Sequence, residues 1–338
     1  MNRNSFLYRA LRHAWRRVRF LKMSRTLFAD SLYDTRRYLS WSHGTGFDRT
    51  ERQKRHALYK AYHGVEKGLS LAEPRPNFGA AKVKSLINTT GTFITAHGTA
   101  HAAPAVSALH FYDRFNRSHD ITNPALDAFL GQHPDDGTGG TETVRAQDLH
   151  AIVANVGHDF FWSRHSVRNF SDRPVEMEDI RAAVEMARKT PTVCNRQGVR
   201  VHVFEKAQEA LDWQPGNRGF GHLASCGLVV TADMQAFSSP GERNQPYVDG
   251  GMFSMSLLYA LHAQGLGACP LAWSASRKYD REVREALGIP DSEAIIMMIA
   301  VGHLPEEFQT ARSHRMPLDH FMVVHPAGQA KSRTESSA

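Results

Sequence analysis

The chain has 338 residues, of which 41% are hydrophobic, which is enough for one large domain or two smaller domains with a buried core. Its formal net charge of +7 comes from one end. Residues 1–60 contain 15 Lys and Arg against 4 Asp and Glu, whereas the remaining residues contain 26 against 30. Because most of the chain is slightly acidic, we expect no nucleic-acid partner.

Three cysteines, Cys194, Cys226 and Cys269, lie far apart and form no CxxC pair, so the sequence predicts neither a disulfide framework nor a metal site. No apolar run approaches the roughly 18 residues of a membrane span. The first 23 residues are too densely charged for the apolar region of a signal peptide. These features favour a cytoplasmic protein.

The first segment has the pattern of an amphipathic helix. Its apolar side carries Leu7, Leu11, Ala14, Val18 and Leu21, and its opposite side carries Arg9, Arg12, Arg16 and Arg19. One interpretation is a surface helix that packs on its own domain, with the arginines in solvent. The alternatives are binding to an acidic polymer and contact with an anionic membrane surface through residues 1–22, which would place the protein peripherally on the inner membrane face.

Further helices are predicted at about 24–40, 50–62, 78–95 and 100–116, and strand signals are almost absent before residue 150. Between two of these helices, "YHGVEKGLSL" brings His63, Glu66 and Lys67 together. The group has the residue types for proton chemistry. The favoured interpretation is a helix end, with Lys67 near the last carbonyls and Gly68 at the stop.

The best candidate for a linker is "GQHPDDGTGGTETV", residues 131–144, which is rich in Gly, Asp and Pro residues. We therefore expect a helical N-terminal extension at 1–143, a second domain at 144–326 and a disordered tail at 327–338. A helix that carries Leu149, Ile152, Val153 and Val156 is predicted to open the second domain.

Beyond the linker, predicted helices and buried strands alternate, which is typical of an α/β or α+β domain. The helices are "PVEMEDIRAAVEMARKT" and "GGMFSMSLLYALHAQGLG", and the strands are "VRVHVFE", "CGLVVTAD" and "AIIMMIAVGH". The second helix is apolar on most sides, so the domain core or a second subunit must cover it.

Two arginines and a hydroxyl alternate in "RHSVRNF". Alternate residues of an extended segment point the same way, so Arg164, Ser166 and Arg168 can converge on one ligand. Guanidinium groups suit a phosphate or the polar edge of a heterocycle. The alternative is a solvated charged turn in which the arginines pair with Asp172.

Three later segments could complete such a site. "TPTVCNRQG" offers the Asn195 amide, and "ARSHRMP" offers Arg312 and Arg315 for a phosphate. "GLGACPLAW" is expected to turn from the apolar helix into a loop that lays backbone groups against a flat ring. Each segment is a weak signal by itself, and their order along the chain makes them more specific.

In this order, the segments from about 157 to 325 resemble the nitroreductase family of FMN-dependent oxidoreductases. "RHSVRNFSDRPVEMEDI" is similar to the family's N-terminal signature, and "TPTVCNRQG" to its Pro-Ser-x-x-Asn-x-Gln segment. The glycine-flanked apolar helix, "ACPLAW" and "VREALGIPDSEAIIMMIAVGHLPE" follow as they do in the family. The resemblance implies an α+β fold with a central, mostly antiparallel sheet surrounded by helices, here preceded by a mainly α-helical N-terminal region.

The resemblance also implies a site for FMN at the interface of a homodimer. Residues 191–195 would reach the flavin that is bound chiefly by the other subunit. NADH or NADPH would be the electron donor, and an electron-poor small molecule such as a nitroaromatic or a quinone would be the acceptor. The flavin would carry the chemistry, with no catalytic side chain. The implied FMN contacts are Arg164, His165, Ser166, Arg168, Pro191, Thr192, Val193, Asn195, Asn217, Pro270, Leu271, Ala272 and Arg315.

Two departures from the family pattern leave other functions open. Gly198 and Val199 stand where the family usually has Pro-Trp, and Trp273 follows Ala272 where an acidic residue and glycine are common. Trp273 could stack on a substrate, narrow the pocket against a nicotinamide, or belong to the core. One alternative is a specialised flavin enzyme that oxidises a carrier-bound or peptide substrate without using NAD(P)H directly. The other is a flavin-binding module that docks a membrane-associated polysaccharide assembly, because the "EKGLS" segment resembles extensions of family members linked to surface-polysaccharide genes.

Overall fold

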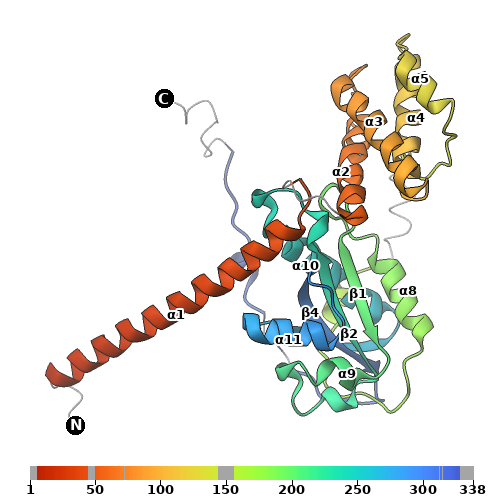
Figure 1. The fold of residues 1–338 in the computed structure, drawn as a ribbon. Helices are drawn as coiled ribbons and strands as arrows, with labels where there is room; N and C mark the ends of the chain where they lie inside the picture. The colour runs from red at the N-terminus through yellow and green to blue at the C-terminus, as the bar shows by residue number, and fades with distance from the viewer. Residues whose placement is uncertain are drawn as a thin grey trace.

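The structure, a computed structural model, describes residues 6–44, 50–71, 73–143, 156–311, 313 and 315–327, with side chains from residue 15 onward. Its centre is a four-stranded antiparallel sheet with the strand order β1-β2-β4-β3 (Figure 1). The strands are β1 (Val199–Phe204), β2 (Cys226–Asp233), β3 (Leu266–Ala272) and β4 (Glu293–His303).

Helices cover both faces of this sheet. On one face, α8 (Met177–Ala187) and α10 (Gln245–Ala263) pack against Leu228 and Val230. On the other face, α9 (Ala207–Leu211) and α11 (Arg277–Ala286) pack on the core that contains Val229. All of β2 is therefore buried, which explains its unbroken apolar sequence. The predicted α+β class, with a mostly antiparallel sheet surrounded by helices, is confirmed.

The segment "GLGACPLAW" is not the predicted loop. Residues 266–272 form β3, which pairs with β4 from Leu266 opposite His303 to Ala272 opposite Met297. β3 is an edge strand, where a proline such as Pro270 is tolerated because only one side of the strand needs its N–H groups. The sequence does not predict this strand, because it contains Gly and Pro residues, which are rare in strands. Its pairing with β4, which is distant in the sequence, stabilises it.

The N-terminal region begins with one continuous helix, α1 (Phe6–Trp41), so the predicted division near residue 23 is wrong. Neither glycine nor proline occurs within it to break it. Figure 1 shows α1 projecting away from the sheet, with only its C-terminal end against the body. There the Arg37 guanidinium donates to the carbonyl oxygens of Asp291 (2.8 Å) and Glu293 (2.9 Å).

Four further helices, α2 (Glu51–Leu69), α3 (Ala80–His97), α4 (Ala103–Arg117) and α5 (Pro124–Leu130), share a core of their own. α2 continues beyond its predicted end near residue 62, and Ser70 is its C-cap. The predicted helix end with Lys67 in the last turn is confirmed, and the helix ends at Leu69, one residue after Gly68. The Phe78 ring packs where a side chain at position 68 would lie, since a Cβ there would be 2.1 Å from Phe78 Cε2.

The predicted linker is packed along α4 as far as it is described. The Arg114 guanidinium lies 3.0 Å from Asp135, and Gly140 packs against the Phe111 ring. The predicted helix at 149–156 and the tail at 327–338 lie almost entirely outside the described residues, so the domain boundaries stay a prediction. Short α7 (His158–Trp162) resumes the described chain. Among the described helices, none is long and apolar enough to cross a membrane.

Candidate functional site

Residues 163–171, here called the strap, run in an extended conformation beside the edge strand β3. Ser166 forms an isolated parallel bridge with Ala268, and the Val167 N–H donates to the Ala268 carbonyl at 3.1 Å. Further along, the Ser171 N–H donates to the His303 carbonyl at 2.9 Å. These backbone bonds fix the strap to the sheet at both ends.

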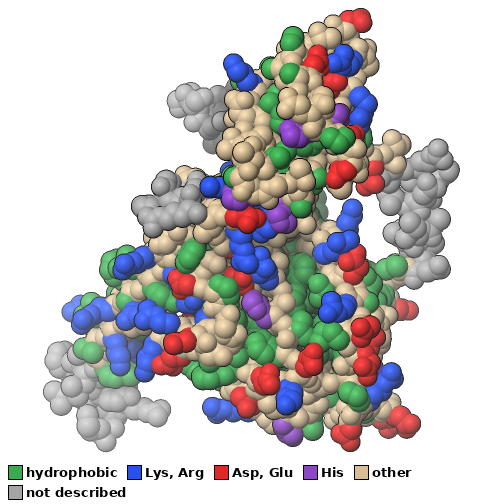
Figure 2. Space-filling view, turned by 45° about the vertical axis from the view of Figure 1, so that its right-hand side comes forward, with side chains coloured by type: hydrophobic (Ala, Val, Ile, Leu, Met, Phe, Trp, Pro, Cys, Tyr) green, Lys and Arg blue, Asp and Glu red, His purple; other side chains and the backbone are tan. Residues whose placement is uncertain are grey.

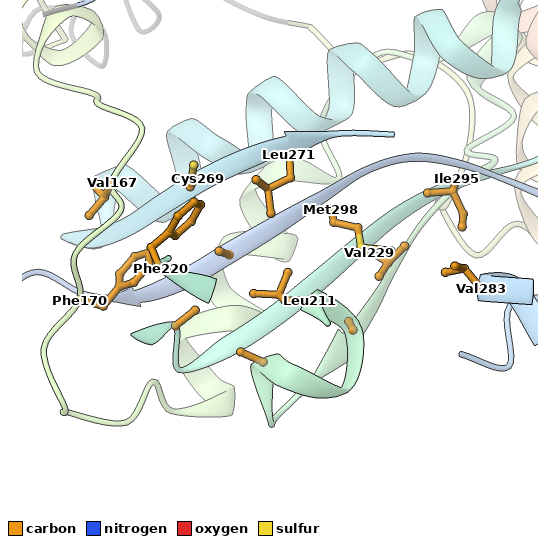
Figure 3. Close-up of a cluster of buried hydrophobic side chains, with 14 of the residues drawn as sticks. Val167, Phe170, Leu211, Phe220, Val229, Cys269, Leu271, Val283, Ile295 and Met298 are labelled. Carbon is orange, nitrogen blue, oxygen red and sulfur yellow. The ribbon is translucent and has the colours of Figure 1, made fainter. Parts of the chain in front are cut away.

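Two apolar side chains fasten the strap to the core, as Figure 3 shows for Val167 and Phe170. The strands beneath carry glycines at the points of contact. A Cβ on Gly302 would lie 2.7 Å from Phe170 Cδ1, and a Cβ on Gly267 would lie 3.1 Å from Val167 Cγ1. The strap can therefore lie directly on the sheet, which leaves its polar side chains outside the core.

Those polar side chains line a cavity of about 570 Å³, here called the arginine cavity. It contains Arg164, His165, Ser166 and Arg168 from the strap and Arg315 from the C-terminal segment. The predicted convergence of the alternate strap residues is therefore seen, and Arg315 joins them from a segment about 150 residues away in the chain. Arg312 lies outside the described residues. The apolar lining includes Met255, Tyr259, Met316 and Phe321.

The guanidinium groups of this cavity have no carboxylate partner among the described residues, Asp172 included. Arg164 Nη1 is buried without a hydrogen-bond acceptor in the described part of the chain. The pKa of His262 is lowered by burial and by the charges of Arg164 and His165. A buried, unpaired donor in a positive environment is satisfied by an anion, so the charged-turn interpretation is the weaker one.

A second cavity of about 390 Å³, the strand cavity, lies along the C-terminal half of β3. Pro270, Leu271, Ala272 and Trp273 line it, together with Gln214, Gly216, Cys269 and Tyr279. Arg168 lines both cavities and is the residue that joins them. Gln214 fixes this wall, because its amide donates to the Ala272 carbonyl at 2.8 Å.

Trp273 has a fixed orientation at the rim of the strand cavity. Its indole N–H donates to Asp280 Oδ1 at 2.9 Å, and its ring stacks on Tyr279 with a centroid distance of 6.0 Å. Sequence reasoning missed the residues that hold it, Tyr279 and Asp280, and also Gln214. No local pattern marks them, since they reach the cavity only through the tertiary fold.

Asn217 lines neither cavity. Its amide nitrogen donates to the Leu211 carbonyl at 2.5 Å, and the neighbouring Gly216 is the residue that borders the strand cavity. The described contacts of Asn217 therefore stabilise its own turn.

Residues 191–195 also line neither cavity. The short helix η1 (Val193–Asn195) is held by Asp249, whose Oδ2 accepts from the Val193 N–H at 3.1 Å. Cys194 and Asn195 have φ values of 49°, and Gln197 has 52°, a left-handed backbone that costs energy outside glycine. Gly198 has a packing reason, because a Cβ there would lie 2.5 Å from the Cβ of Ala236. A proline at this position would not fit.

Taken together, these features define an α+β protein with an arginine-rich strap next to a cavity along a sheet edge. Comparison with known families agrees with that class. Residues 162–215 and 205–303 match a family model described as the nitroreductase family, and this part of the chain belongs to that family.

Two curated relatives are similar over the same part of the chain. A protein of Archaeoglobus fulgidus, provisionally named NADH dehydrogenase/NAD(P)H nitroreductase, is 27% identical over 43% of this chain and 84% of its own. An NADH dehydrogenase of Thermus thermophilus is 26% identical over 47% of this chain and 91% of its own. Among solved structures, a nitroreductase family protein of Streptococcus pneumoniae TIGR4 is 21% identical, with a TM-score of 0.43, over 49% of this chain and 98% of that chain.

Proposed function

We propose that the protein is an FMN-dependent oxidoreductase that passes electrons from NADH or NADPH to an electron-poor small molecule, such as a nitroaromatic or a quinone. The observation that carries the proposal is the meeting of the strap with Arg315 in the arginine cavity, which is also lined by Arg164, whose Nη1 is buried without an acceptor among the described residues. The nicotinamide donor is supported by the names of the two curated relatives.

The residues present fit the parts of FMN in order along the two cavities. Arg164, Ser166 and Arg315 would hold the phosphate in the arginine cavity, where cations and a hydroxyl gather. The apolar wall of the strand cavity, at Pro270 and Leu271, would take the flat ring system. His165 borders the arginine cavity as well and would contact the sugar-like chain between them.

When bound, FMN supplies the hydride-transfer chemistry. Arg168, which lies between the two cavities, would stabilise negative charge on the polar edge of the ring. Gln214 would keep the β3 wall in place through its bond to Ala272. None of these roles requires a side chain that gains or loses a proton, so we propose no catalytic acid or base.

We further propose that the protein works as a homodimer. α10 is mostly buried, yet Tyr247, Val248 and Met252 are about half exposed on it. A second copy would cover them. In such a dimer residues 191–195, which line neither cavity of their own chain, would approach the flavin of the partner. We also propose the division into an extension at 1–143 and a flavin domain at 144–326, and a cytoplasmic location.

The fixed Trp273 favours a second candidate, a flavin enzyme that does not take NAD(P)H directly. Its indole is held by both Asp280 and Tyr279, so it narrows the strand cavity and leaves less room for a nicotinamide over the ring. The substrate would then be the electron donor, for example a carrier-bound or peptide substrate.

A flavin spectrum followed by anaerobic reduction tests both candidates. Purified protein should carry bound FMN. NADH or NADPH should then bleach the absorbance of the oxidised flavin, which has its visible maximum at about 450 nm. Bound FMN that neither nicotinamide reduces would support the second candidate. A colourless protein that FMN titration cannot convert would reject both and leave a flavin-free docking module.

A further inference from the structure

An exposed apolar stripe runs along the projecting part of α1. Val18, Leu21, Phe28 and Leu32 are between 57% and 71% exposed, and their spacing of three, seven and four residues puts them on one side of the helix. Side chains of this size are normally covered in a folded protein. Figure 1 shows that this part of α1 lies away from the sheet and its helices, which leaves the stripe for something outside the chain.

The same part of the helix is strongly cationic. Residues 1–29 contain eight Lys and Arg and no Asp or Glu. Of its described cations, Arg25 lies within the stripe and Arg17 and Lys22 lie along its two edges, whereas Arg16 and Arg19 lie on the opposite side of the helix. Figure 2 shows the blue and green side chains of this projecting segment gathered at the left of the view. The first acid, Asp30, pairs with Arg277 at 3.3 Å, at the point where the helix reaches the body.

We propose that α1 docks on an anionic lipid surface, with Val18, Leu21, Phe28 and Leu32 at the boundary of the acyl chains. Arg17, Lys22 and Arg25, in or beside the stripe, would extend to the lipid phosphates, since their long stems let the charge stay in the headgroup layer. Trp15, which lies beneath the Arg19 guanidinium at 5.4 Å, belongs to the residue type that prefers this layer. The helix lies on the surface, since it is not apolar enough to span it.

The positive charge of α1 favours lipid over a second copy of the helix as the partner of the stripe. Pairing two α1 helices through the stripe would bring ten cations together, five from each, without an acid between residues 15 and 29 to offset them. An anionic surface instead gains attraction from each cation. The proposal rests on α1 alone and is independent of the flavin assignment.

The C-terminal end of α1 is bonded to the body of the protein, so docking of α1 would also orient the body relative to the lipid surface. Tyr38 donates its hydroxyl to the Ser239 carbonyl at 2.8 Å, and the Trp41 indole donates to Asp291 at 3.0 Å. With Arg37 also bonded to the start of β4, α1 holds the body at a defined side of the lipid surface.

The test is co-sedimentation of the full-length protein with vesicles of phosphatidylglycerol and phosphatidylcholine in equal parts, and with phosphatidylcholine alone. We expect at least about tenfold tighter binding to the anionic vesicles, because five cations each contribute. The double variants Leu21→Glu/Phe28→Glu and Arg17→Glu/Lys22→Glu should each lose about tenfold or more of that affinity. The matched controls are Leu71→Glu and Arg188→Glu, exposed residues outside α1, and they should bind as the unchanged protein does.

Equal binding to both vesicle types, no binding, or full binding by the α1 variants would each overturn the proposal. Circular dichroism and flavin content of the variants establish that they are folded. Light scattering after gel filtration measures the molar mass, and so tests whether a second copy of the protein binds the stripe instead of lipid. If the Leu21→Glu/Phe28→Glu variant has a lower mass than the unchanged protein, and the unchanged protein binds no vesicles, the stripe belongs to an interface between copies.

Discussion

Replacement of Arg164 by alanine should weaken FMN binding and leave riboflavin binding nearly unchanged. Arg164 lines the arginine cavity, and one nitrogen of its guanidinium, Nη1, is buried without an acceptor among the described residues. A hydrogen bond to a charged group contributes about 1.5–3 kcal/mol. One such bond to the phosphate therefore corresponds to a loss of roughly 10- to 150-fold in FMN affinity. Riboflavin has no phosphate, so its affinity should change by less than about threefold.

The same variant makes a second, opposite prediction for the flavin-free protein. A buried donor without a partner destabilises the fold by about 1–3 kcal/mol, so its removal should not lower the melting temperature of the apoprotein. With saturating FMN the order should reverse, because the bound ligand stabilises only the form that retains Arg164. Few structural roles for an arginine give this change of sign.

Titration of apoprotein with FMN and with riboflavin, followed by fluorescence quenching, measures both affinities. Arg188→Ala is the matched control, since Arg188 is an exposed arginine that pairs only with Glu185 at 2.7 Å among the described carboxylates. Equal losses for FMN and riboflavin would place Arg164 at the ring or in the scaffold. An unchanged FMN affinity, or a clear loss of apoprotein stability, would refute the anion-site reasoning.

Three further predictions concern the strap, the rim and the buried histidine. Gly302→Val should displace the Phe170 ring, lower stability by about 1–3 kcal/mol and reduce flavin retention. Gly64→Ala in α2, where no atom lies within 4 Å of the new Cβ, should do neither, and equal flavin retention in both variants would contradict the packing argument. Trp273→Leu should speed anaerobic flavin reduction by NADH if the indole narrows the strand cavity, and an unchanged stopped-flow rate would remove the second candidate function's main support. Burial above all lowers the pKa of His56 from 6.5 to about 3, so the folded state resists protonation, and stability present above pH 6.5 is lost as the pH falls toward 3. His56→Phe should flatten this part of the urea-unfolding profile, and an unchanged slope would show that other groups cause it.

The elements that were predicted best are those whose type can be recognised from a short run of residues. "CGLVVTAD" and "AIIMMIAVGH" are apolar runs too short for most helices, and both are buried strands in the sheet. The alternation of Arg164, Ser166 and Arg168 predicted their common direction, because an extended backbone fixes it within a few residues. Arg315 was a weak candidate from its own segment, and the family resemblance strengthened it, since nothing local links residues about 150 positions apart.

The errors come from features that depend on contacts distant in sequence. β3 contains Gly267 and Pro270, which disfavour a strand, yet its pairing with β4 prevails. The strap needs Gly302 in a neighbouring strand as much as its own Phe170, and a sequence pattern shows only one side of that contact.

One carboxylate connects the N-terminal extension with the rim of the strand cavity. Asp280 accepts from the Trp273 indole at 2.9 Å through one oxygen, and its other oxygen lies 3.8 Å from the Arg37 guanidinium and 3.4 Å from the Tyr33 hydroxyl of α1. α1 therefore helps to orient the acid that orients Trp273. A truncation that ends before Tyr33 removes the lipid-docking part and keeps this network, whereas removal of all of α1 takes away both. Under the lipid-docking proposal α1 would have two separable roles, because its cationic half projects from the body and its last turns contact the acid that holds Trp273.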